Sequence, residues 1–181
     1  MAEIVTRRLA LQDWRDLRAI RLQALRAEPG VFSGSIAAAE VQPQSWWEDL
    51  TRGAPHQAFG AFDGQAMIGL ITVFTWKEDP TGGTAFIGML YVDAGFRGRG
   101  VSHRLFDAAM DWVRAQPRFG RAMVGHRASN IASMRAILRQ RFVEMRRQSV
   151  RWPDGTDDDE VDYVLVLSGT TATTIVPRIE A

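Results

Sequence analysis

Apolar side chains recur along the chain with two spacings, one typical of helices and one typical of strands. Val101, Leu105, Ala108 and Trp112 follow one another at intervals of four, three and four, which predicts a helix over residues 101–115 that Pro117 closes. Shorter helical patterns cover residues 13–26, 43–51 and 129–139. Apolar or alternating segments predict strands over residues 4–9, 57–62, 67–76, 84–92, 121–125, 142–152 and 161–167.

The order of these elements indicates a fold class. One strand is followed by two helices, three strands, a helix, a strand, a helix and a final hairpin of two strands. This is the order of a mixed α/β (α+β) sheet flanked by about four helices, and it differs from an alternating doubly wound fold. We expect a single domain over residues 1–168 and a threonine-rich tail over residues 169–181. The acidic segment 153–160 is expected to form the loop of the last hairpin.

Composition excludes several kinds of chemistry. The chain has 181 residues, of which 46% are hydrophobic, and it contains no cysteine. Disulfides, zinc–thiolate sites and a cysteine nucleophile are therefore excluded. His56, His103 and His126 lie far apart without a partner at helical spacing, so no metal site is expected. No apolar stretch is long enough to span a membrane and the N-terminus does not read as a signal peptide, so we expect a cytoplasmic protein without a membrane partner.

Charge is balanced overall and uneven along the chain. The net charge is +1, but residues 96–152 contain thirteen arginines against three acidic residues, a local net charge of +10. An arginine-rich segment is often only a solvated surface. Because the planar guanidinium binds phosphate through paired hydrogen bonds, the segment also suits an anionic ligand. Nucleic acid fits the same charge, so the sign alone does not decide the partner.

A glycine cluster lies where the apolar strand over residues 84–92 passes into the helix over residues 101–115. Residues 97–102 read RGRGVS. Glycines let a ligand approach the backbone, and the first N–H groups of a helix have no partner within it, so the cluster suits a bound anion. The spacing matches neither the phosphate loop G-x-x-x-x-G-K-[S/T] nor the dinucleotide motif G-x-G-x-x-G. A helix-capping turn without a ligand is the alternative.

The cluster and its surroundings resemble the GNAT superfamily of N-acetyltransferases. Arg97-x-x-Gly100-x-Ser102 after Leu90-Tyr91-Val92 is similar to the family's motif A, and Asn130 with Phe142 twelve residues later is similar to its Asn…Gly-Phe segment. The resemblance covers residues 4–167. It implies a largely antiparallel central sheet of about seven strands. Relatives of unassigned substrate share the first-helix stretch RLQALRAEPGVF.

This resemblance implies a site for acetyl-coenzyme A as cosubstrate. The pantetheine arm would lie beside Tyr91 and Val92, the pyrophosphate on the turn 97–102, and Asn130 would reach the pantetheine or the acetyl region. The implied cofactor-binding residues are Tyr91, Val92, Arg97, Gly98, Arg99, Gly100, Val101, Ser102 and Asn130.

The implied activity is transfer of the acetyl group to a primary amine, of a small molecule or a protein, directly within a ternary complex. No metal and no nucleic acid are expected, and a homodimer is compatible with this interpretation. The alternative is a non-catalytic module that binds acyl-coenzyme A or nucleic acid.

The sequence departs from the family at the residues that move protons. Ile137 stands seven residues after Asn130, where many members carry a tyrosine that protonates the leaving thiolate. The strand over residues 84–92 holds no Asp or Glu, so no catalytic residue is assigned, and Asp93, Glu40 or a chain of waters are the candidates for the base. Arg21, Phe32, Glu40, Trp46 and Trp47 are candidates for lining the acceptor pocket. The acidic run 157–160 is expected at the hairpin tip, either solvated or attracting a cationic amine.

Overall fold

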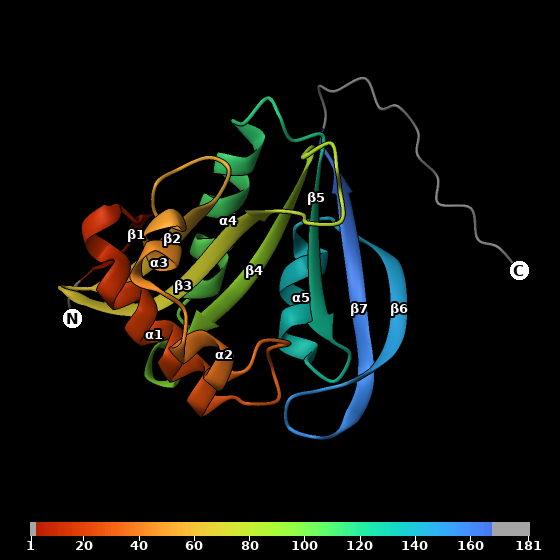
Figure 1. The fold of residues 1–181 in the computed structure, drawn as a ribbon, viewed down its shortest axis with the longest axis horizontal. Helices are drawn as coiled ribbons and strands as arrows, with labels where there is room; N and C mark the ends of the chain where they lie inside the picture. The colour runs from red at the N-terminus through yellow and green to blue at the C-terminus, as the bar shows by residue number, and fades with distance from the viewer. Residues whose placement is uncertain (1–2, 168–181) are drawn as a thin grey trace, which may run out of the picture.

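A seven-stranded sheet organises the molecule in the computed structural model, which describes residues 3–167 (Figure 1). The strands lie in the order β1-β2-β3-β4-β5-β7-β6, and among these described strands only β4 and β5 run parallel. Their bounds are β1 (Ile4–Arg8), β2 (Gln57–Asp63), β3 (Ala66–Thr75), β4 (Thr84–Val92), β5 (Arg121–Arg127), β6 (Val143–Arg151) and β7 (Asp157–Val166). The mixed, largely antiparallel sheet predicted from the sequence is confirmed. The predicted tail over residues 169–181 lies outside the described residues.

Five α-helices accompany the sheet where about four were predicted. They are α1 (Trp14–Ala27), α2 (Ile36–Glu40), α3 (Gln44–Asp49), α4 (Val101–Arg114) and α5 (Ile131–Arg139). Helix α2 was not anticipated. Ser35 begins it by accepting a hydrogen bond from the Ala38 N–H group (3.2 Å), and none of its residues is buried, so no apolar periodicity announces it in the sequence.

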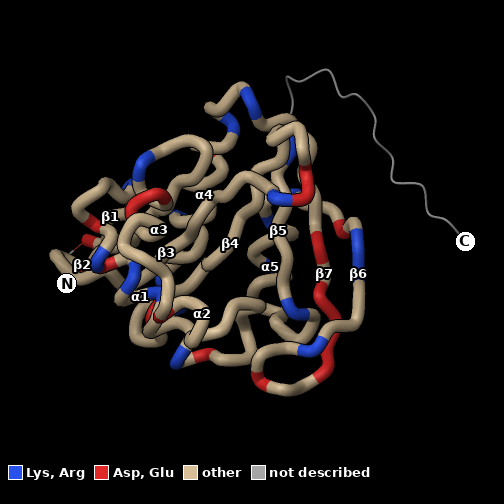
Figure 2. Tube along the Cα trace, viewed as in Figure 1, with Lys and Arg blue, Asp and Glu red and all other residues tan. Residues whose placement is uncertain are grey.

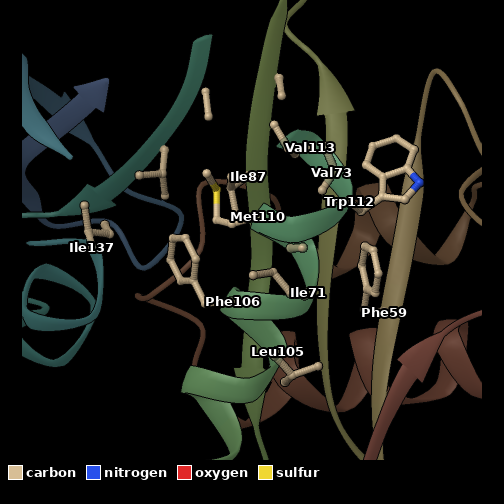
Figure 3. Packing of buried hydrophobic residues seen from close by; sticks show 14 of the residues in the cluster. Phe59, Ile71, Val73, Ile87, Leu105, Phe106, Met110, Trp112, Val113 and Ile137 are labelled. Carbon is tan, nitrogen blue, oxygen red and sulfur yellow. The ribbon is translucent and has the colours of Figure 1, made fainter. Parts of the chain in front are cut away.

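Helix α4 builds the larger part of the core on one face of the sheet. Its apolar stripe places Leu105, Phe106 and Met110 against Ile71 and Ile87 from the central strands (Figure 3). All five side chains are at most 1% exposed. Burial of an apolar side chain of this size contributes about 1.5–3 kcal/mol, which explains why the stripe fixes the helix on the sheet.

Helix α1 covers the opposite face of β3 and β4. Leu17 and Ile20 pack there against Leu70 and Tyr91, and Trp47 of α3 joins the same cluster. The sheet is therefore covered on both faces over β2–β4, with α4 and α1 on opposite sides.

The final hairpin differs from the prediction. The prediction of an acidic loop over residues 153–160 is wrong, because β7 already begins at Asp157. Acidic side chains of β7 form ion pairs with basic ones of β6: Arg151 lies opposite Asp157 at 3.1 Å, and Arg147 reaches Asp159 diagonally at 3.6 Å. Opposite charges on neighbouring strands stabilise the pairing, so an acidic run forms a strand here instead of a solvated tip (Figure 2).

Strands β4 and β5 part in the middle of the sheet. Their parallel pairing runs over four residue pairs, from Thr84 opposite Arg121 to Ile87 opposite Val124. Beyond these pairs β4 continues to Val92 beside β3, whereas β5 continues beside β7, and the two separate into a V (Figure 1). Met89 has a positive φ of 57°, and the register against β3 shifts nearby, which turns this end of β4 away from β5.

Candidate functional site

A cavity of about 470 Å³ lies where β4 ends and α4 begins. It is lined by the end of β4, the turn that precedes α4, and one face of α5. Eight of the nine residues predicted from the sequence line it: Tyr91, Val92, Arg97, Gly98, Gly100, Val101, Ser102 and Asn130. The ninth, Arg99, does not line this cavity, and its guanidinium lies over the Phe96 ring, 5.2 Å from the centroid.

The turn before α4 has the geometry of an anion cradle. Gly98 and Gly100 have φ values of 74° and 75°, a left-handed conformation that residues with a side chain rarely adopt. The first backbone bond of α4 joins the Arg104 N–H group to the Gly100 carbonyl (3.2 Å). The N–H groups of residues 101–103 precede this bond and, together with the helix dipole, favour a negative charge at this end.

The Arg97 side chain holds the turn in place. Its Nε donates to the Val92 carbonyl (3.0 Å), and its guanidinium forms an ion pair with Glu28 just after α1. The sequence did not indicate these two partners. The Arg97 side chain therefore connects the segment after α1 to the turn. The negative charge of Glu28 partly neutralises the Arg97 guanidinium at the cavity.

Asn130 has a structural role at the start of α5. Its side-chain oxygen accepts a hydrogen bond from the Ser133 N–H group (3.1 Å) and so caps the helix. Its side-chain NH₂ group remains as the donor that a ligand in the cavity could use.

A second cavity of about 70 Å³ continues from the first into the V between β4 and β5. The two share Val31, Leu90, Asn130 and Ser133 as lining residues. The small cavity also reaches Ile137, whose side chain is only 1% exposed. A hydrocarbon therefore occupies the position at which the family resemblance would place a tyrosine hydroxyl.

His126 on β5 also lines the small cavity, a role that its isolated position in the sequence did not signal. Its Nδ1 lies 2.6 Å from the Arg127 carbonyl, which requires the proton on Nδ1 and leaves Nε2 as the acceptor. Nε2 is 3.4 Å from the Tyr163 hydroxyl, and the two rings stack with centroids 5.4 Å apart. Burial raises the pKa of the Tyr163 hydroxyl, so the phenol remains protonated.

The two carboxylates considered as bases have structural partners. Asp93 accepts hydrogen bonds from the Gly95 N–H group (2.9 Å) and from the Gln23 side chain (2.6 Å). Glu40 forms an ion pair with Arg26 at 2.7 Å on the surface. Neither of them lines the two cavities.

The aromatic candidates for the acceptor pocket separate into two groups. Phe32 lines the small cavity, and Arg21 lies over its ring at 4.5 Å. Burial lowers the pKa of the Arg21 guanidinium to about 10. Trp47 is completely buried and Trp46 meets it edge-on at 4.7 Å, and neither lines the two cavities. This pair therefore packs α3 against the core.

Arg127 fastens the last hairpin to the segment after α1. Its Nη1 donates to the Gly30 carbonyl (2.7 Å) and to Asp154 (2.6 Å), and its Nε donates to Asp158 (2.9 Å). Arg127 lowers the pKa of Asp154 to about 2, and hydrogen bonds from Ser129 and Arg127 lower the pKa of Asp158 to about 2. The contact joins the last hairpin to the segment between α1 and α2.

This contact predicts a loss of stability in acid. An aspartate in the unfolded chain has a pKa of about 3.9. Since folding lowers both pKa values, the stabilisation is present above pH 4 and disappears as the pH falls towards 2. Arg127→Gln should therefore lower the melting temperature at pH 6 and have little effect at pH 2. A difference between the two proteins that is the same at both pH values would contradict this explanation.

No group of His, Asp and Glu side chains within residues 3–167 is arranged to hold a metal ion. Over the same residues, no helix is both long and apolar enough to cross a bilayer.

Comparison with known protein families identifies relatives of this chain. A family model described as the acetyltransferase (GNAT) family matches residues 14–142. None of the curated proteins compared with the chain is a match.

Several solved structures share the fold. An acetyltransferase of the GNAT family from Streptococcus pneumoniae is similar over 91% of this chain and 100% of its own, with a TM-score of 0.78 and 15% identity. Salmonella typhimurium yncA, solved with its cofactor acetyl-CoA, gives a TM-score of 0.76 and 16% identity over 97% of this chain and 100% of its own. Arabidopsis thaliana NAA60 in complex with a bisubstrate analogue gives 0.71 and 18% identity over 93% and 100%.

Proposed function

Because this chain belongs to the acetyltransferase (GNAT) family, we propose that it transfers the acetyl group of acetyl-coenzyme A to a primary amine within a ternary complex. The observation that carries the proposal is the 470 Å³ cavity, which brings the glycine turn, the free end of β4 and Asn130 together. The acetyl-CoA-bound relative yncA, of the same fold, supports the choice of cosubstrate. The reaction is assigned to the cytoplasm, since a chain without cysteine needs no oxidising compartment.

The residues around the cavity fit the parts of the cosubstrate. The N–H groups of residues 101–103 and the local charge of +10 suit the pyrophosphate. Backbone groups of β4 beyond Ile87 have no partner on β5, so they suit an extended arm that adds to the strand. The apolar walls of the small cavity, including Phe106 and Ile137, suit a group as small as the acetyl.

Proton movement is consistent with direct transfer. A primary ammonium with a pKa of about 10.4 must lose a proton before it attacks. The coenzyme A thiolate, with a pKa of about 8.5, departs without a strong acid beside it, so Ile137 is compatible with turnover. Positioning two reactants in one site lowers the barrier by several kcal/mol, which is the main contribution this site offers.

Release of free thiol tests the proposal. The chain has no cysteine, so a thiol reagent reports coenzyme A alone, without background from the protein. Spermidine, L-lysine and a tetrapeptide that begins with alanine are suitable acceptors. Thiol release that requires both protein and amine would support the transferase. Tight binding of acetyl-coenzyme A with no release for any acceptor would instead favour the non-catalytic binding module.

We expect initial-rate plots that intersect. Without cysteine no acetyl-cysteine can form, so we expect both substrates to occupy the protein at once. Rates measured at several fixed concentrations of the amine distinguish the two schemes. Parallel lines would indicate an acetylated protein as an intermediate and would contradict direct transfer.

A further inference from the structure

Two glycines mark the point at which β4 and β5 separate. Gly88 follows the last paired residue of β4, and Gly125 follows the last paired residue of β5. Both line the small cavity. Neither carries a side chain, so side chains of the neighbouring strands approach the backbone at the apex of the V.

A carboxylate from the next strand covers Gly125. Asp162 on β7 lies opposite Gly125 in the register, and a Cβ atom built on Gly125 would lie 2.6 Å from Asp162 Oδ1. The carboxylate therefore occupies the space that a side chain at position 125 would fill. Asp162 is only 2% exposed and does not itself line either cavity; Gly125, which it covers, lines the small one.

Both hydrogen bonds that the Asp162 carboxylate accepts from Arg146 end on the same oxygen. Arg146 donates from Nε (2.8 Å) and from Nη2 (2.6 Å), and both bonds end on Oδ2. Over residues 3–167 no hydrogen bond ends on Oδ1, and this oxygen is not one of the fully buried side-chain atoms that lack a partner, so it keeps a small exposure of its own. Oδ1 is thus an acceptor held beside the V with its capacity unused.

The two faces of the sheet separate this carboxylate from the larger cavity. Val161 and Tyr163, the neighbours of Asp162 on β7, both pack into the core on the α4 face. Since side chains alternate along a strand, Asp162 points to the face of α1. The larger cavity is lined mostly by the turn before α4, the first residues of α4 and α5, with Tyr91, Glu28 and Val31 contributing from the side of α1.

We propose that Asp162 is the catalytic residue that binds the ammonium group of the acceptor and removes its proton, a role that rests on the proposed acetyl transfer. An N–H bond of the ammonium breaks and its proton passes to Oδ1. The nitrogen lone pair then forms the C–N bond at the thioester carbonyl carbon, and the C–S bonding pair leaves with sulfur. The nitrogen loses its second proton to that sulfur, so the products are the neutral amide and the coenzyme A thiol. Asp162 returns the proton to solvent.

The same residue makes the site selective for cationic amines. Glu160 lies two residues earlier on the same face of β7 and lines a groove of about 370 Å³ beside Ser33 and Trp152. Acidic residues follow one another along β7 (Figure 2). Asp157, Asp158 and Asp159 are ion-paired with arginines, whereas Glu160 accepts a hydrogen bond from Gln148 (3.1 Å). Glu160 is therefore the charge that attracts a cationic acceptor before it reaches Asp162.

Asp162→Asn tests the role, with Asp159→Asn as the matched control. Asp159 is on the same strand, is 41% exposed and undergoes the same change of charge. With the most active amine of the three named above, Asp162→Asn should lower kcat/KM by about 100-fold or more. The dissociation constant for acetyl-coenzyme A should change by less than a factor of about two, and the control should match the wild type. A kcat/KM for Asp162→Asn within threefold of the wild type would overturn the assignment.

Gly125→Ala tests the position of the Asp162 carboxylate if the Asp162→Asn protein is too unstable to be assayed. Its Cβ displaces Oδ1 while the carboxylate is retained, and kcat/KM should fall at least about tenfold with binding of acetyl-coenzyme A unchanged. An unchanged rate would overturn the assignment. A wild-type protein that binds acetyl-coenzyme A and acetylates none of the three amines would contradict the proposed function itself, before any variant is compared.

Discussion

Gly100→Glu should weaken the binding of acetyl-coenzyme A by at least about 100-fold, because the change places bulk and negative charge where the backbone has to meet the pyrophosphate. Loss of even one or two charge-assisted hydrogen bonds, each worth about 1.5–3 kcal/mol, accounts for an effect of this size. Gly100 also has a φ of 75°, so any side chain there adds about 1–2 kcal/mol of backbone strain. Titration calorimetry measures the affinity directly.

Gly64→Glu is the control that separates strain from lost recognition. Gly64 lies in the turn between β2 and β3, has a φ of 59°, and, like Gly100, has no atom within 4 Å of a Cβ built on it. The two variants therefore share the backbone strain and the added charge, but only Gly100 lines the cavity. Equal affinities for Gly100→Glu and Gly64→Glu, with both proteins folded, would remove the turn from the cofactor site.

Phe106→Ala should lower the free energy of unfolding by about 3–5 kcal/mol, a large part of the 5–15 kcal/mol typical of a domain. Phe106 lies in the core (Figure 3) and is 1% exposed. It meets the Phe142 ring edge-on at 6.0 Å and forms part of the wall of the small cavity. Its truncation leaves a void that the neighbouring helix and strands fill only in part. Urea denaturation measures the change.

Leu138→Ala provides the comparison for Phe106→Ala. Leu138 is 49% exposed on α5, and a surface truncation changes the unfolding free energy by about 0.5 kcal/mol or less. If Phe106→Ala cost no more than Leu138→Ala, the α4 stripe would not be the core that its burial indicates.

The parts of the fold that the sequence predicted are those with strong periodicity. Helix α4 was evident because one of its faces is fully buried, and the strand over residues 84–92 because both of its faces are covered. Helix α2 has no buried face, so nothing in its pattern distinguished it from a loop. The prediction of a loop over the acidic residues 157–160 was wrong because it took no account of the arginines on β6. Their opposite charge stabilises this acidic run as a strand.

The residues of the candidate site also differ in how far the sequence predicted them. The glycine turn is contiguous in sequence, so its residues could be named in advance and most of them line one cavity. Asp162 could not be found in this way, because its place depends on the register between β5 and β7 and on a glycine opposite it. His126 also gave no signal, since its neighbours in space come from another strand.

The separation of β4 from β5 gives the sheet a third edge, in its interior, besides those at β1 and β6. Exposed strand edges are the usual starting points of aggregation. The outer edge at β6 carries Glu144, Arg146 and Arg147, charges that discourage another chain from pairing with it. The interior edge is protected from pairing with another chain because α4, α5 and the segment around Val31 surround it. Under the proposed function, the extended pantetheine arm is the partner that pairs with this interior edge.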